Sequence, residues 1–408
     1  MTPIRTVTIA GGGLAGLTVA RELRSRGFDG TVRIIDPEGL PYDRPPLSKA
    51  YLAGTTDRAA LHLAPPDWFT DNDIRIVEDS VTKLDLGQGS VLLASGSELI
   101  SDAVVLATGG RARRLAVPGG DLPGVLKLRT HADADHLRDK LFPGCRLVVV
   151  GAGLIAAEVA STATNLGAHI TLIDPVPVPL IPAVGEELAR RLHEMHAEHG
   201  VQIVTGKPTR IAAEGGTLLV DVGSPHGADR LAADLVLVAI GIEPDTVLAD
   251  TAGLRTDTGI EVTATGATSN PAVWAAGDGI RIRTAEGGLL PRSEHWEAAI
   301  LSGTATACGL LGAQAPQRPP AWFWSDRYGV HVEAVGSMTA PGSTVLRDTG
   351  NGRLTAFRVD THGVLVGCAT IDGGKVLRAA KRLIMRQARV GLDHLADPAV
   401  DLRKVDRT

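Results

Sequence analysis

Residues 6–16 read TVTIAGGGLAG, and this stretch decides the fold. Its first five residues predict a buried strand, and Gly11, Gly13 and Gly16 form the G-x-G-x-x-G pattern of a dinucleotide-binding turn. A helical pattern follows, and then a second predicted strand ends in Asp36. The first glycine permits a tight turn, the second lets the backbone approach a pyrophosphate, and the third lets helix and strand pack closely. We therefore expect a pyrophosphate at the helix N-terminus and a ribose at Asp36.

The same unit recurs later in the chain, where residues 146–153 read RLVVVGAG. Gly151 and Gly153 take the first two glycine positions, Ala156 takes the third, as the pattern allows, and the next strand ends in Asp174. Glycine is common here, at 48 of 408 residues, so one triplet alone would mean little. Two triplets in the same strand, helix and strand context predict two dinucleotide sites. The residues that open the two helices complete these sites: Leu14, Ala15, Leu154 and Ile155.

The second site is predicted to prefer NADH over NADPH. Asp174 stands where the 2′-hydroxyl of a ribose is bound, and a 2′-phosphate there would meet a like charge. Residues 175–187 contain no Lys or Arg that could offset the repulsion.

Three further apolar runs, each followed by a glycine, predict parallel strands that are covered on both faces. These runs are residues 103–107, 235–240 and 273–276. A proline-rich linker is expected at 316–320, and beyond it the hydrophobic period changes to that of short antiparallel strands. We predict an α/β fold with two Rossmann-like, glutathione-reductase-like dinucleotide domains and a C-terminal α+β domain with an antiparallel sheet. A hairpin is expected from strands at 357–359 and 364–366.

Composition excludes several classes of protein. Hydrophobic residues are 44% of the chain, charged residues are 21% and the net charge is −5, so we expect a globular protein that does not bind nucleic acid. Cys145, Cys308 and Cys368 are too far apart for a metal-ligand spacing, and their odd number argues against a disulfide framework. No signal peptide or membrane-spanning stretch is recognised, so a cytoplasmic protein with no membrane partner is expected.

Other short motifs lie between and beyond the two glycine turns. They are YDRPPLSK at 42–49, ATG at 107–109, Glu158, IGIEP at 240–244, AGD at 276–278, WFWSD at 322–326 and DLRK at 401–404. In this order, along essentially the whole chain, they resemble the NADH-dependent ferredoxin reductases of oxygenase systems. These are FAD-dependent pyridine nucleotide oxidoreductases of the putidaredoxin reductase and biphenyl dioxygenase reductase type.

The resemblance implies a domain order and an activity. It implies a discontinuous FAD domain at 1–107 and 244–316, an NADH domain at 108–243 and a C-terminal interface domain at 317–408. It implies hydride transfer from NADH to FAD, and then single electrons to a [2Fe-2S] ferredoxin that feeds a Rieske dioxygenase or a haem monooxygenase. A monomer or a homodimer is expected.

The resemblance also implies roles for individual residues. Lys49 would lie beside the flavin N5 atom, and Glu158 would face the nicotinamide and pair with Lys49. The ordinary alternatives are a solvated lysine and a carboxylate favoured by the dipole at a helix start. Further FAD contacts are expected at Arg44, Val81, Ala107, Thr108, Gly109, Arg129, Gly277, Asp278 and Trp296, and a further NADH contact at Gly241.

The C-terminal domain offers two features with a possible role in electron transfer. Trp322 and Trp324 belong to the segment that approaches the flavin and the ferredoxin in the family, although core anchoring is the usual role of Trp. Four arginines recur at helical spacing and form either a solvated face or a surface that steers an acidic ferredoxin. They are Arg378, Arg382, Arg386 and Arg389.

Other classes of flavoprotein are alternatives to a ferredoxin reductase. Disulfide reductases and the related NADH oxidases and peroxidases need a redox thiol near the flavin, and the first 144 residues contain no cysteine. An NADH-rubredoxin reductase would share the architecture, and so would a flavoprotein like apoptosis-inducing factor, in which NADH switches assembly.

Overall fold

The computed structural model describes residues 4–224, 227–350 and 353–405, which group into two compact units. The first unit comprises the chain up to Arg44 together with Arg58–Arg111 and Ile242–Arg318. The second unit comprises Pro45–Asp57, Ala112–Gly241 and the chain from Pro319 onward. The segment that carries Lys49 therefore belongs with the second glycine turn, and the C-terminal part groups with it too. The three predicted domain boundaries stay a prediction.

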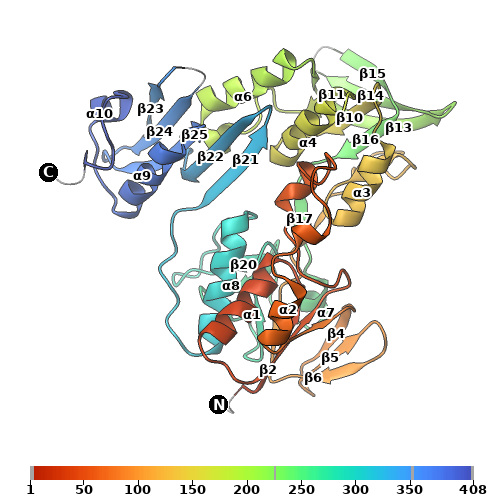
Figure 1. Cartoon of the computed structure of the whole chain (residues 1–408), viewed down its shortest axis with the longest axis vertical. Coiled ribbons are helices and arrows are strands. Elements are labelled where there is room, and N and C mark those ends of the chain that lie inside the picture. The colour runs from red at the N-terminus through yellow and green to blue at the C-terminus, as the bar shows by residue number, and fades with distance from the viewer. Residues whose placement is uncertain (1–3, 225–226, 351–352, 406–408) are drawn as a thin grey trace. The chain divides into compact units, whose positions relative to one another are not determined.

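The first unit is built on a five-stranded parallel sheet in the order β19-β7-β1-β2-β3. Its bounds are β1 Thr6–Ala10, β2 Thr31–Ile35, β3 Ile74–Val77, β7 Ala103–Leu106 and β19 Val273–Ala275. The helices are α1 Leu14–Ser25, α2 Pro66–Asp71, α7 Val247–Thr251 and α8 Trp296–Leu310, with a 3₁₀ turn η2 at Ala59–Leu61. Helices α1 and α8 run side by side (Figure 1). The buried core lies between this pair of helices and the sheet.

Smaller sheets complete the first unit. An antiparallel sheet in the order β4-β5-β6 covers the other face of the parallel sheet together with α7. Two further strand pairs, β8 with β17 and β18 with β20, form separate two-stranded sheets. The bounds are β4 Val81–Asp85, β5 Ser90–Leu93, β6 Glu98–Ile100, β8 Gly110–Ala112, β17 Ile242–Pro244, β18 Ile260–Val262 and β20 Ile280–Ile282.

The second unit repeats the parallel architecture in the order β12-β11-β10-β16-β9. The bounds are β9 Val125–Lys127, β10 Arg146–Val150, β11 His169–Asp174, β12 Gln202–Thr205 and β16 Leu235–Val238. Its helices are α3 His131–Lys140, α4 Leu154–Asn165, α5 Ile181–Val184 and α6 Glu186–Glu198, with a 3₁₀ turn η1 at Pro45–Ser48. An antiparallel sheet of β13 Lys207–Glu214, β14 Thr217–Ser224 and β15 Gly227–Ala233 packs on it.

The C-terminal part of the second unit is a five-stranded antiparallel sheet in the order β21-β22-β25-β24-β23. The bounds are β21 Trp322–Arg327, β22 Val330–Gly336, β23 Gly342–Asp348, β24 Leu354–Asp360 and β25 Leu365–Ile371. Side chains of α5 and α6 pack on one face of this sheet. On the other face lie α9 Gly374–Met385 and α10 Leu392–Ala396, as Figure 1 shows at the blue end of the chain.

The fold-class prediction is confirmed. All three apolar runs form central or edge strands of the two parallel sheets, and the part beyond the linker forms the expected antiparallel sheet. The predicted strand at 357–359 lies within β24, and the one at 364–366 overlaps the start of β25; both observed strands are longer than expected and pair antiparallel. Among the described residues, no helix has the length and apolar character needed to cross a membrane.

Candidate functional site

The first glycine turn joins β1 to α1. Gly11 has a φ of +113°, and a Cβ added there would lie 2.3 Å from the carbonyl oxygen of Ala107. A Cβ at Gly16 would lie 2.1 Å from the carbonyl oxygen of Gly11. A Cβ at Gly13, by contrast, would meet nothing within 4 Å. Packing therefore requires the first and third glycines, while the second opens onto free space at the helix N-terminus, where a pyrophosphate fits.

Asp36 follows β2 and is held by two backbone amides. Its Oδ2 accepts a hydrogen bond from the N–H of Gly12 at 2.6 Å, and its Oδ1 accepts one from the N–H of Glu38 at 2.8 Å. Each carboxylate oxygen has a further lone pair, so the ionised group can still accept a bond from a ribose hydroxyl. The turn and the acid thus form one preorganised nucleotide site.

Several other predicted FAD contacts lie in the first unit, where side-chain bonds fix them. The Thr108 hydroxyl donates to the carbonyl oxygen of Asp245 at 2.7 Å. The Trp296 indole, at the start of α8, donates to Asp43 Oδ1 at 2.9 Å. The Arg44 guanidinium lies 3.6 Å from Glu38 Oε2 and over the Tyr42 ring.

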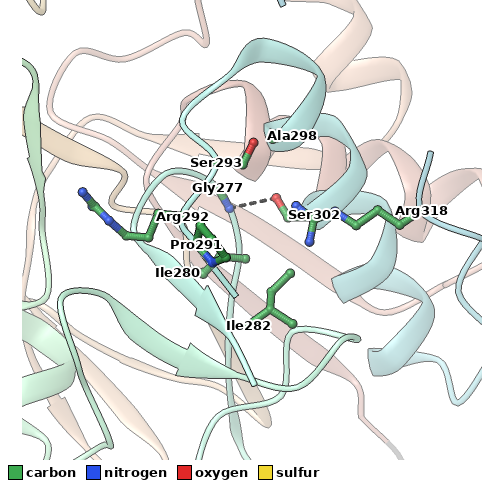
Figure 2. Close-up of a pocket in the computed structure, with 9 residues that line it drawn as sticks. All are labelled: Gly277, Ile280, Ile282, Pro291, Arg292, Ser293, Ala298, Ser302 and Arg318. Atoms are coloured by element: carbon green, nitrogen blue, oxygen red, sulfur yellow. Dashed lines mark hydrogen bonds between the residues drawn. The ribbon is translucent and has the colours of Figure 1, made fainter. Parts of the chain in front are cut away.

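Val81 and Asp278 have different surroundings. Val81 opens β4 and packs, partly buried, against the apolar core, and its predicted contact with FAD stays a prediction. Asp278 is half-buried in the turn between β19 and β20, and burial lowers the pKa of the neighbouring His295. The adjacent Gly277 donates its N–H to Ser302 Oγ at 3.0 Å and borders a small pocket between β20 and α8 (Figure 2).

The second glycine turn, between β10 and α4, repeats the geometry of the first. Gly151 has a φ of +104°, and a Cβ there would lie 2.5 Å from the carbonyl oxygen of Ala239, whereas a Cβ at Gly153 would meet nothing within 4 Å. Asp174 accepts two backbone hydrogen bonds, each of 2.8 Å. The N–H of Ala152 donates to its Oδ2, and the N–H of Val176 donates to its Oδ1. This turn therefore also presents an open helix N-terminus beside a fixed carboxylate. Gly241, predicted to contact the same nucleotide, follows the neighbouring strand β16 with a φ of +91°.

An ion pair is buried beside this second turn. Lys49 Nζ lies 2.9 Å from Glu158 Oε2, and the two side chains are 20% and 6% exposed. Glu158 lies one turn into α4, and Lys49 follows η1. Lys49 also donates to the carbonyl oxygen of Pro45 at 3.2 Å. The predicted contact between these residues is present, and neither the solvated lysine nor the simple helix-start carboxylate describes it.

Two serines complete the bonding of Glu158. Ser48 Oγ donates to Oε2 at 2.5 Å, and Ser325 Oγ, from β21, donates to Oε1 at 2.7 Å. The carboxylate thus accepts from two hydroxyls and one ammonium, and this arrangement suits the ionised form. Sequence reasoning quoted both serines within motifs but gave them no role. Only the fold shows that their strands and turns converge on α4.

A second chain of polar groups leads from Lys49 towards more exposed positions. Asp326 Oδ2 lies 4.0 Å from Lys49 Nζ, and Asp326 Oδ1 lies 2.5 Å from Nδ1 of His331. Glu333, on the neighbouring strand β22, accepts a hydrogen bond from the indole N–H of Trp322 at 3.1 Å.

The two tryptophans of β21 lie against each other. Trp322 and Trp324 stack with ring centroids 5.1 Å apart, while Phe323 between them faces the core. The tryptophans are only half-buried and lie on the opposite face of β21 from Phe323.

Arg129 and the four C-terminal arginines have surroundings that differ from those expected from the sequence. Arg129 was expected to contact FAD, yet it belongs to the second unit, where its N–H donates to Asp133 in the capping box of α3. Of the arginine stripe, Arg378 and Arg382 are exposed on α9, but Arg386 caps that helix and Arg389 lies beyond it. The four arginines are exposed without forming one continuous helical face.

Two open glycine turns on parallel sheets, each with an amide-held aspartate, define an oxidoreductase that works with two dinucleotides. Residues 5–303 match the pyridine nucleotide-disulphide oxidoreductase family and residues 322–405 match the reductase C-terminal family. The chain belongs to the pyridine nucleotide-disulphide oxidoreductase family, in the branch that carries this C-terminal domain. The predicted class of enzyme is confirmed.

Relatives of known activity match almost the whole chain. The ferredoxin–NAD(+) reductase subunit of the benzene 1,2-dioxygenase system of Pseudomonas putida is 36% identical over 407 residues, covering 98% of this chain and 97% of that protein. The ferredoxin reductase for the CYP199A2 system of Rhodopseudomonas palustris superposes with a TM-score of 0.92 and 33% identity, covering 98% and 99%. The covalent putidaredoxin reductase–putidaredoxin complex superposes with a TM-score of 0.90 and 31% identity, covering 98% and 97%.

Proposed function

We propose that this protein is an NADH-dependent ferredoxin reductase that uses FAD and passes single electrons to a [2Fe-2S] ferredoxin of an oxygenase system. The names of its relatives support the activity, and two separate dinucleotide turns support the pair of nucleotides. The observation that carries the proposal is the Lys49–Glu158 ion pair next to the second turn. A disulfide-reducing member of the family would instead need a thiol, and Cys145, Cys308 and Cys368 are all buried.

FAD is assigned to the first turn. The N-terminus of α1 would bind its pyrophosphate, Asp36 its adenosine ribose and Asp278 its ribityl chain. When bound, FAD accepts two electrons with a hydride and gives them up one at a time. The first unit supplies binding and orientation, while the chemistry belongs to the cofactor.

NADH is assigned to the second turn. The N-terminus of α4 would bind the pyrophosphate, and Asp174, oriented by its two backbone amides, would accept bonds from the adenosine ribose. NADPH would place a phosphate against this fixed carboxylate, and the following loop has no cation to offset the repulsion.

Lys49 is proposed to act beside the flavin N5 atom, and Glu158 is proposed to face the nicotinamide of NADH. Glu158 fixes the ammonium of Lys49, so that a positive charge would already be in place where the flavin gains negative charge. A fixed charge of this kind favours the movement of negative charge without any reorganisation of the protein during the reaction.

An anaerobic titration tests the proposal. The protein with FAD should be yellow, should be bleached by NADH and should remain yellow with NADPH. A [2Fe-2S] ferredoxin should restore the colour, and a rubredoxin should restore it far more slowly. Fast reoxidation by rubredoxin alone would indicate an NADH-rubredoxin reductase. A stable reduced protein whose mass changes with NADH would indicate a flavoprotein like apoptosis-inducing factor, in which NADH switches assembly. A colourless protein that takes up no FAD would contradict the assignment as a whole.

The identity of the ferredoxin would show whether the terminal oxygenase is a Rieske dioxygenase or a haem monooxygenase.

We propose that the protein is cytoplasmic and is a monomer or a homodimer. Light scattering of the purified protein, with and without NADH, measures its mass.

A further inference from the structure

Arg327 is a buried arginine that the proposed function leaves unexplained. It ends β21 and is only 2% exposed. Its Nη2 donates to Ser325 Oγ at 3.3 Å, and its Nε has no hydrogen-bond partner among the described residues. Burial lowers the pKa of Arg327 to about 10, and the charge of Glu158 opposes that shift. The guanidinium is therefore charged at neutral pH.

A buried guanidinium is costly unless an anion compensates for it. Residues 323, 325 and 327 alternate along β21 with their side chains on its buried face. Ser325 on that face already touches Glu158, and the next residue, Tyr328, donates its N–H to Ser161 Oγ of α4 at 2.7 Å. The strand thus brings Arg327 to the same helix that carries Glu158. Asp326, on the other face, is half-exposed and pairs with His331 instead.

The hydrogen bond between Arg327 and Ser325 has a defined direction. A guanidinium can only donate, so Arg327 occupies a lone pair of Ser325 Oγ. The hydroxyl proton of Ser325 is then left to point at Glu158 Oε1, which lies 2.7 Å from Ser325 Oγ. Ser48 and Lys49 occupy Oε2 of the same carboxylate. Donors therefore meet both oxygens of the Glu158 carboxylate, and together they hold it in one orientation.

We propose that Arg327 is a positioning residue that, through the Ser325 hydroxyl, holds ionised Glu158 in place and thereby fixes the ammonium of Lys49. The importance of that ammonium for hydride transfer rests on the proposed function, whereas the positioning itself does not. The order of contacts is Arg327, Ser325, Glu158 and Lys49, and each link is a donor meeting an acceptor.

The test compares Arg327→Gln, which removes the charge, with Arg327→Lys, which keeps it. Arg347→Met is the matched control, because Arg347 is 3% exposed in the same sheet but donates to the backbone carbonyls of Leu395, Val400 and His394, far from this network. Loss of the Arg347 guanidinium should reduce thermal stability and leave proton exchange at the Lys49 ammonium unchanged. Ser325→Ala removes the intermediate hydroxyl with little loss of volume and serves if Arg327→Gln does not fold.

The first measurement is proton exchange at the Lys49 ammonium by NMR of protein with nitrogen-15 in its lysine side chains, with Lys49→Arg identifying the signal. Exchange should be at least about tenfold faster in Arg327→Gln and Ser325→Ala than in the wild type. Arg327→Lys and Arg347→Met should stay within about twofold of the wild type. Wild-type exchange in a folded Arg327→Gln or Ser325→Ala protein would overturn the proposal.

The second measurement is stopped-flow reduction of the FAD-loaded protein by NADH. The rate of reduction should fall about tenfold in Arg327→Gln, while the Kd for NADH changes less than about twofold, and Arg327→Lys should recover most of the rate. A purely structural role would weaken binding and rate together. If the wild-type protein is not reduced by NADH, the proposed function fails, and the exchange measurement still decides the role of Arg327.

Discussion

At the scale of single residues, the central feature is Glu158, a buried carboxylate with three donors from two separate segments. Ser48 and Lys49 come from the segment around η1, and Ser325 comes from β21. A buried charge with one partner removed is strongly destabilising, while replacing a whole buried pair with apolar groups is often tolerated. Variants that remove one partner and variants that remove both therefore separate the structural role of the pair from its proposed role in hydride transfer.

Lys49→Met should lower both stability and activity. It leaves Glu158 buried without its cation, so the free energy of unfolding should fall by about 2–4 kcal/mol in denaturant titrations. Reduction by NADH should slow at least about tenfold. The double variant Lys49→Met/Glu158→Leu should recover stability but not the rate. As a control, Lys127→Met removes a lysine that is 63% exposed and should change neither. An unaltered rate in Lys49→Met would refute the catalytic role.

Asp174→Ala should change the preference between the two nicotinamide nucleotides. The variant removes the carboxylate that is proposed to bind the ribose and to repel a 2′-phosphate, so kcat/KM should fall at least about tenfold for NADH and rise for NADPH. Asp36→Ala is the matched control in the other turn and should weaken FAD binding without altering the preference. Steady-state kinetics with both nucleotides give the ratio, and a ratio like that of the wild type would contradict the assignment of Asp174.

At the scale of elements, the two glycine turns show what a sequence pattern determines. β1, β10 and β11 span the residues predicted for them, because apolar strand, glycine turn and helix are local signals that the parallel sheet reinforces. The C-terminal sheet was predicted only in outline. Three of its four pairings join consecutive strands, but the pairing of β22 with β25 joins segments that are distant in the sequence and that no local pattern marks. The serines around Glu158 could not be assigned, because tertiary packing alone brings β21 and η1 to α4.

Two neighbouring glycines of the second turn should respond differently to the same substitution. Gly151→Ala would place a Cβ 2.5 Å from a carbonyl oxygen at a φ of +104°, so we expect a loss of about 2 kcal/mol or more in stability. Gly153→Ala meets no protein atom within 4 Å, so the fold should persist while NADH binding weakens at least about tenfold. Thermal unfolding and NADH titration separate the two. Unweakened binding by Gly153→Ala would argue against a pyrophosphate at this turn.

Helix α6 carries a pH-sensitive contact with the turn after β21. His196 bonds to the Tyr328 hydroxyl at 2.7 Å, and burial lowers the pKa of His196 from 6.5 to about 3. Between these values the unfolded chain binds a proton that the folded protein does not. Stability should therefore be full above about pH 6.5 and fall on acidification, by up to about 1.4 kcal/mol per pH unit from this group.

Denaturant titrations from pH 7 to pH 4 measure that slope. His196→Gln should show a shallower dependence on pH than the wild type, and the exposed control His362→Gln should match the wild type. An equal slope in His196→Gln and the wild type would show that His196 does not account for the effect.

At the scale of the whole molecule, each unit contributes one dinucleotide turn, and their sequences interleave. The first unit contains Gly11, Asp36, Thr108, Asp278 and Trp296. The second unit contains the second glycine turn, which is proposed to bind NADH, together with the Lys49–Glu158 pair and the C-terminal sheet. Short motifs made both nucleotides predictable, but not the grouping of residues 45–57 with the second unit, because that grouping depends on contacts between distant segments. The assignments of individual cofactor contacts, Arg129 among them, remain predictions.

The electron balance between NADH and ferredoxin tests the proposed activity as a whole. The FAD-loaded protein is mixed anaerobically with limiting NADH and excess oxidised [2Fe-2S] ferredoxin, and the visible spectrum records ferredoxin reduction. We expect two ferredoxins to be reduced per NADH, with fast turnover and little reaction with NADPH, because a hydride carries two electrons and each cluster accepts one. Bleaching of the protein by NADH with no reduction of any [2Fe-2S] ferredoxin would contradict it.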